Sequence, residues 1–105
     1  MTALPAKPSH PSPLYVKLLG ETSKIDWAEL ERFFAQGQLL LVAPDADLVC
    51  VAEALANDDK PCITEWLASG AVQKMPASSA ANIAAHQLAL WAVVVSPWIC
   101  VQECP

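Results

Sequence analysis

Positive charge is scarce in this sequence of 105 residues, which has six lysine or arginine side chains against eleven aspartate or glutamate side chains. The resulting net charge of −5 repels the phosphates of nucleic acids and the headgroups of anionic membranes. We therefore expect neither nucleic acid nor a membrane surface to be a partner of this chain.

Long hydrophobic runs are also missing. The longest apolar stretch, Leu88–Val95, is much shorter than the roughly 20 residues that a membrane-spanning helix needs. The first thirteen residues contain four prolines in place of the basic and then apolar regions of a secretory signal. These two absences predict a cytoplasmic protein.

The motifs of common enzyme classes are absent as well. The chain has three glycines and no glycine-rich phosphate loop, and it contains neither G-x-S-x-G nor H-E-x-x-H. A cysteine nucleophile would need a base such as His86, which could approach Cys50, Cys62 or Cys100 in space. A lone histidine at the end of an alanine-rich helix more often stabilises the helix dipole. We therefore predict no catalytic residue and no cofactor.

Hydrophobic residues, in contrast, are abundant at 54% of the chain, and charged residues make up 16%. A chain of this length has room for one domain with one hydrophobic core, so some apolar surface is expected to remain outside it. We therefore expect a homo-oligomer, most simply a two-fold dimer, or another protein as the partner.

Local signals predict four to five short helices. Residues 1–12 are proline-rich and predict a flexible tail, so the single globular domain is expected over 13–105. Asp26 and Glu29 have the spacing of a capping box. An aspartate at 45 or 47, and another at 59, stand where N-caps are preferred. The expected helices cover about 13–19, 26–36, 47–57, 59–69 and 77–87, the last capped by Pro76, Ser78 or Ser79.

Two segments predict strands. Gln38–Ala43 is a short apolar run that ends at a proline. Leu88–Gln102 is rich in branched and aromatic side chains, with Ser96-Pro97 marking either a hairpin turn or a bend. Residues 72–75 are ambiguous. The expected fold is α+β, a small and mostly antiparallel sheet covered by helices, whose single core includes Trp27, Phe34, Leu55 and Trp66.

Trp98 and Trp91 lie in the longest apolar segment and are candidate interface residues. An exposed strand edge in Leu88–Gln102 offers amides and carbonyls to a second copy of the chain. Trp98 follows Pro97, where a bulge or turn re-aims a side chain outward. The alternative is that both rings fill the core.

Several stretches together resemble a known family. They are GETSKIDW at 20–27, VAPDADLV at 42–49, NDD at 57–59, WLASG at 66–70 and WAVVVSPW at 91–98. The sequence resembles DUF2288, a family of short proteins from proteobacteria and cyanobacteria, over about 14–103. The resemblance implies a compact bacterial domain, and it supplies no active-site residues.

Two acidic pairs are the candidates for a metal site. Asp45 with Asp47, or Asp58 with Asp59 and Glu53, offer the oxygen ligands that Mg²⁺ and Ca²⁺ take. The spaced glycine and terminal glutamate of a calcium loop are missing. Helix capping accounts for the same aspartates without a metal, so we predict no metal ligand at any position.

The four cysteines are expected to be free thiols, because the cytosol is reducing. Cys100 and Cys104 have a spacing seen in zinc sites, but the remaining ligands of a tetrahedral site are missing.

Taken together, these features of the sequence predict a non-catalytic interaction or regulatory module. The alternative is a small enzyme or a divalent-metal-binding protein that uses the acidic pairs.

Overall fold

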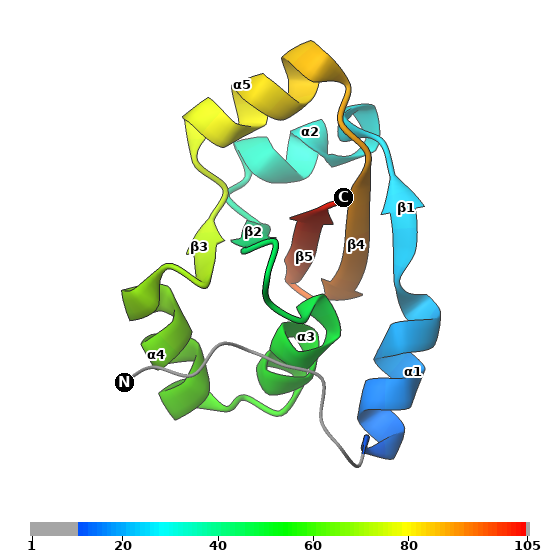
Figure 1. Cartoon of the computed structure of the whole chain (residues 1–105), viewed down its shortest axis with the longest axis vertical. Coiled ribbons are helices and arrows are strands. Elements are labelled where there is room, and N and C mark those ends of the chain that lie inside the picture. Colours follow the sequence, from blue (N-terminus) through cyan, green and yellow to red (C-terminus); the bar gives the residue numbers. More distant parts are fainter. Residues whose placement is uncertain (1–10, 105) are drawn as a thin grey trace.

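The computed structural model describes residues 11–104, so the predicted tail, except its last two positions, lies outside the described residues. Figure 1 shows helices and strands mixed along the chain. The described residues form five helices and five strands. In chain order these are α1 (Pro13–Glu21), β1 (Ser23–Ile25), α2 (Trp27–Ala35), β2 (Leu39–Val42), α3 (Leu48–Ala56), α4 (Lys60–Ser69), β3 (Val72–Lys74), α5 (Ala77–His86), β4 (Leu90–Val95) and β5 (Trp98–Glu103).

The strands form one sheet in the order β1-β4-β5-β2-β3. All neighbours are antiparallel except β2 and β5, which are parallel. The segment predicted as a hairpin or a bent strand is a hairpin, since Val95 of β4 pairs with Trp98 of β5 across the turn at Ser96-Pro97. The exposed strand edge predicted in this segment is wrong, because β4 and β5 each have a neighbouring strand on both sides. The predicted α+β fold with a mostly antiparallel sheet is confirmed.

Both faces of the sheet are covered, and this corrects the prediction of a single core. Buried residues of α1, α3 and α4 form one cluster, and those of α2 and α5 form another. Neighbouring strand residues point to opposite faces. Leu40 and Cys100 therefore enter the first cluster, while Leu39 and Val101 enter the second. Of the four side chains expected in one core, Leu55 and Trp66 pack on the first cluster, and Trp27 and Phe34 pack on the second.

Helix starts follow the predicted caps in most cases. The Asp26 amide donates to Glu29 Oε2 at 3.4 Å in the capping box of α2. Asp47 caps α3 and Asp59 caps α4. One boundary differs from the prediction, because α1 continues through Gly20 to Glu21. α5 has Pro76, one of the predicted start positions, at its N-cap, with no side-chain cap from a serine.

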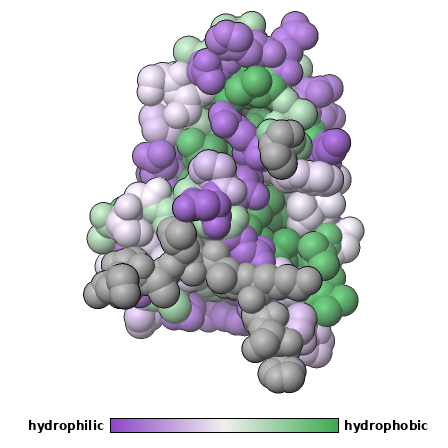
Figure 2. All heavy atoms as spheres, viewed as in Figure 1, coloured by the Kyte–Doolittle hydropathy of each residue, from purple (hydrophilic) through white to green (hydrophobic). Residues whose placement is uncertain are grey.

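Large exposed hydrophobic side chains are few and spread out. On the face drawn in Figure 2, hydrophobic atoms gather at the lower right, where Figure 1 places α1. α1 carries Val16 and Leu19, and among the described residues Leu67 and Val94 complete the set. The two cores therefore bury most of the hydrophobic side chains that motivated the prediction of a dimer.

No helix within residues 11–104 has the length and apolar character needed to cross a bilayer.

Candidate functional site

Two of the predicted acidic residues hold α1 against α3. Asp47 Oδ1 accepts hydrogen bonds from the amides of Val49 at 2.9 Å and Cys50 at 3.2 Å. Its Oδ2 accepts one from the Tyr15 hydroxyl at 2.6 Å. The Ser12 hydroxyl donates to Glu53. Burial, and next the hydrogen bond to Asp47, raise the pKa of the Tyr15 phenol above its ordinary value. These carboxylates are therefore committed to holding two helices together.

The other predicted ligands are dispersed. Asp59 Oδ1 accepts a hydrogen bond from the Cys62 amide at 3.4 Å and so caps α4. Asp58 has a left-handed backbone with φ of 53°. Its exposed carboxylate lies 4.0 Å from the Lys60 ammonium, which is exposed as well. Asp45 lies exposed in the turn before α3. Capping therefore accounts for Asp47 and Asp59 and not for Asp45 and Asp58. Within residues 11–104 no three histidine, cysteine or acidic side chains come together as a metal-binding group.

Trp98 and Trp91, the predicted interface residues, are half-buried against the first core. Each ring has a lysine ammonium over it. Lys74 Nζ is 5.9 Å from the centroid of Trp98, and Lys24 Nζ is 5.3 Å from that of Trp91. Trp98 also lines a hollow of about 280 Å³ beside α4. Both rings thus pack on the core and remain partly exposed, and their role in an interface stays a prediction.

None of the four cysteines, all of which lie within residues 11–104, forms a disulfide in the structure. Cys100 is buried, and burial raises the pKa of its thiol to about 12 from 9.0. At Cys62 the hydrogen bond with Asp59, followed by burial, also raises the thiol pKa. A raised pKa disfavours the reactive thiolate.

His86 ends α5, where its Nδ1 lies 3.0 Å from the carbonyl oxygen of Asn82. This is the dipole-stabilising position at a helix end that the sequence favoured.

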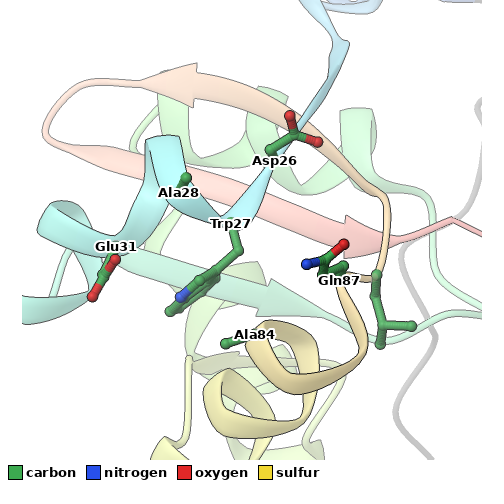
Figure 3. Close-up of a pocket in the computed structure, with 7 residues that line it drawn as sticks. Asp26, Trp27, Ala28, Glu31, Ala84 and Gln87 are labelled. Carbon is green, nitrogen blue, oxygen red and sulfur yellow. The ribbon is translucent and has the colours of Figure 1, made fainter.

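A groove of about 420 Å³ lies between α2 and α5, and it is the site that sequence reasoning missed. Figure 3 shows the ring of Trp27 extending from α2 toward Ala84 of α5. The ring is held in place by Phe34, whose centroid is 5.6 Å away at an interplanar angle of 55°. The α2 side of the groove is formed by Asp26, Trp27, Ala28 and Glu31, and its α5 side by Ala84, Gln87 and Leu88.

The polar side-chain groups of this groove are two carboxylates, one carboxamide and the indole N–H of Trp27. In Figure 3 the Glu31 carboxylate and the Gln87 carboxamide lie on either side of the Trp27 ring, whereas the Asp26 carboxylate points away from it. Lys60–Asp58 is the single ion pair among residues 11–104, so no described basic side chain neutralises Glu31. Arg32, the next residue, lies over the ring of Phe33 with Cζ 4.7 Å from its centroid. The groove is therefore aromatic and negatively charged.

Gln87 occupies an unusual backbone conformation at the lip of the groove. As the C-cap of α5 it has φ of 49° and ψ of 47°, and its amide donates to the carbonyl of Ile83. Glycine is the common residue at left-handed helix ends, because other residues adopt this conformation at a cost of about 1–2 kcal/mol. Here a glutamine takes the position, and its carboxamide is thereby placed beside Trp27.

The described residues form a small α+β domain with a concave surface between α2 and α5. Residues 13–103 match the family described as "Protein of unknown function (DUF2288)", and this chain belongs to that family. The NMR solution structure of PA1075 from Pseudomonas aeruginosa is similar, with a TM-score of 0.78 and 48% sequence identity. The match covers 92% of this chain and 90% of that one. A search of curated proteins finds no match.

Alkaline pH is expected to destabilise the fold through Cys100. Because burial raises its pKa from 9.0 to about 12, its stabilising contribution is complete below pH 9.0 and is lost as the pH rises toward about 12. Above pH 9.0 the free energy of unfolding falls by up to about 1.4 kcal/mol for each pH unit, because the unfolded chain releases the Cys100 proton at a lower pH than the folded chain does. Tyr15 acts in the same direction at higher pH, since its pKa is also raised.

Urea unfolding between about pH 8 and 11 measures this effect in the native chain and in Cys100→Val, which removes the thiol at similar volume. The variant is expected to lose less stability over this range. Equal losses in the two proteins would show that the alkaline transition has another origin.

Proposed function

We propose that this chain is a non-catalytic interaction module that binds a protein partner through the groove between α2 and α5. The observation that carries this proposal is the Trp27 ring, which is half-buried and forms a wall of a groove of about 420 Å³. Tryptophan is the residue type most enriched at the energetic centres of protein interfaces, where its large ring enters a pocket or forms one. The small side chains of Ala28 and Ala84 leave this ring accessible.

A peptide selection tests the proposal directly. A random peptide library displayed on phage is selected against the native chain, and the enriched peptides are then measured against two variants. Ala84→Arg fills the groove, and Ala81→Arg adds the same side chain to α5 outside it. Both alanines are exposed, so both variants are expected to fold. We expect enriched peptides to lose at least tenfold in affinity for Ala84→Arg and little for Ala81→Arg, since the first blocks the central contact.

Equal binding to both variants, or no selected peptide sensitive to Ala84→Arg, would contradict the proposal.

The predicted alternative, a small enzyme or a divalent-metal-binding protein, has its own test. A rise in melting temperature with Mg²⁺ or Ca²⁺ that Asp58→Asn abolishes would favour that alternative, because a ligand that binds the native state stabilises it.

Self-association through the hairpin of β4 and β5 is a further proposal. It is supported by Val94, which is 61% exposed within the longest apolar segment of the chain. Light scattering over a dilution series is expected to show a dimer that dissociates on dilution, and Val94→Thr is expected to weaken it. A monomer mass at every concentration would end this proposal, and an unchanged dimer in Trp98→Ala would remove Trp98 from the interface.

The predicted cytoplasmic location of the protein stays a prediction.

A further inference from the structure

We infer that the groove between α2 and α5 recognises the guanidinium group of an arginine on the partner, stacked on Trp27 and hydrogen-bonded to Glu31. This inference rests on the proposed function and names the chemistry of its ligand. The inferred occupant is an exposed, arginine-bearing segment of another protein.

The arrangement of Trp27 and Glu31 on α2 is the first part of the argument. The two residues are four positions apart, so they project from the same side of the helix about one turn from each other. Figure 3 shows the indole ring and the carboxylate on the side of α2 that faces α5. A cation placed against the ring lies within reach of a carboxylate that is exposed and unpaired with any described basic side chain.

The α5 side of the groove adds a carboxamide. The Gln87 carboxamide lies on the other side of the Trp27 ring from Glu31, with its nitrogen nearer the ring (Figure 3), and a half-turn of the amide group turns its accepting oxygen toward a cation. α5 also ends at the groove with His86 and Gln87, so the negative end of its helix dipole favours a cation there. The opposing positive end of α2 is already satisfied by its own capping box of Asp26 and Glu29. The net field in the groove therefore attracts positive charge.

The shape of the ligand follows from the same groups. Guanidinium is planar, stacks on aromatic rings and carries five N–H donors, which can serve the Glu31 carboxylate and the Gln87 carboxamide at once. A lysine ammonium is compact and more strongly hydrated, so it loses more on leaving water. Acidic ligands are repelled by Glu31 and by the net charge of −5. The chain's own arginine, Arg32, is engaged with Phe33.

The test uses the ¹⁵N-labelled full chain and four capped peptides that differ at one central position. That position is arginine, its uncharged analogue citrulline, lysine or glutamate, within an otherwise identical alanine and glycine sequence. The readout is the indole N–H resonance of Trp27, and the indoles of Trp66, Trp91 and Trp98 serve as internal controls. We expect the arginine peptide to shift Trp27 and the amides of Ala84 and Gln87, with at least threefold weaker binding of the other three peptides.

Two charge-neutral variants make the test specific to the groove. Glu31→Gln is expected to weaken arginine binding by about threefold to tenfold, because it removes the charged acceptor from a partly solvated site. Glu65→Gln removes the same charge from an exposed position of α4, on the opposite face of the sheet, and is expected to leave binding unchanged.

Each other outcome overturns the inference in a distinguishable way. Equal binding of arginine and citrulline, or tighter binding of lysine or glutamate, contradicts guanidinium recognition while the proposed function stands. Selected peptides that depend on Ala84 but contain no arginine do the same. A Trp27 resonance that moves on dilution of the protein without peptide identifies a second copy as the occupant. No Trp27 shift with any of the four peptides, together with no selected peptide sensitive to Ala84→Arg, overturns both proposals.

Discussion

Replacing Asp47 with alanine is expected to lower the free energy of unfolding by about 2–4 kcal/mol. The substitution removes the N-cap of α3, worth about 1 kcal/mol in most helices. It also removes the acceptor of the Tyr15 hydroxyl, which is buried and would be left without its 2.6 Å partner. One side chain thus contributes to the start of α3 and to the docking of α1.

Two further variants separate these contributions in urea unfolding. Asp47→Asn keeps an oxygen for the cap and is expected to cost less than alanine. Tyr15→Phe removes the hydroxyl and leaves the cap intact. Because Tyr15 and Asp47 are in direct contact, the cost of Tyr15→Phe combined with Asp47→Ala should fall short of the sum by about 0.5–2 kcal/mol. Full additivity would show that the hydrogen bond does not couple α1 to α3.

Leu30→Ala and Val51→Ala are expected to be strongly destabilising and independent of each other. Both side chains are fully buried, but Leu30 belongs to the cluster under α2 and α5, whereas Val51 belongs to the cluster under α1, α3 and α4. Leu30→Ala should cost about 2–5 kcal/mol and Val51→Ala somewhat less, since it removes fewer buried carbons. The sheet lies between the two sites, so their costs should add within about 0.5 kcal/mol.

The matched comparison is Val51→Ala with Val93→Ala, because both residues lie in the first cluster. That pair is expected to deviate from additivity, since the two cavities share neighbours. Urea unfolding of the three single and two double variants gives all the values. Strong coupling between Leu30 and Val51 would instead support the single core that the sequence predicted.

The elements with local causes were predictable from the sequence. The start of α2 depends on Asp26 and Glu29, which are three positions apart, and the end of α4 depends on Gly70, whose φ is 86°. β1 was missed because its three residues, Ser23–Ile25, carry no alternating apolar pattern, and they form a strand through pairing with Leu90–Ala92. Non-local pairing also accounts for the second core. The apolar run 38–43 predicts a buried strand, but it does not specify that helices cover both of its faces.

The groove could be predicted only in part. Trp27 was correctly predicted to lie in a helix and to pack on a core, and the spacing of Trp27 and Glu31 is visible in the sequence. The opposite wall comes from Ala84 and Gln87, more than fifty positions away, and depends on how α5 packs against α2. The left-handed backbone of Gln87 carried no sequence signal, because glutamine is not a residue type that favours it.

The position of β5 in the sheet has a consequence for the order in which the chain can fold. β5 is the last of the five strands along the described chain, yet it occupies the centre of the sheet (Figure 1). Before Trp98–Glu103 leaves the ribosome, β1 and β4 can form one pair and β2 and β3 another, with nothing between them. The open edges of β4 and β2 then expose unpaired amides and carbonyls to other nascent chains. Completion of this fold therefore waits for β5, which enters between the two pairs and closes both edges together.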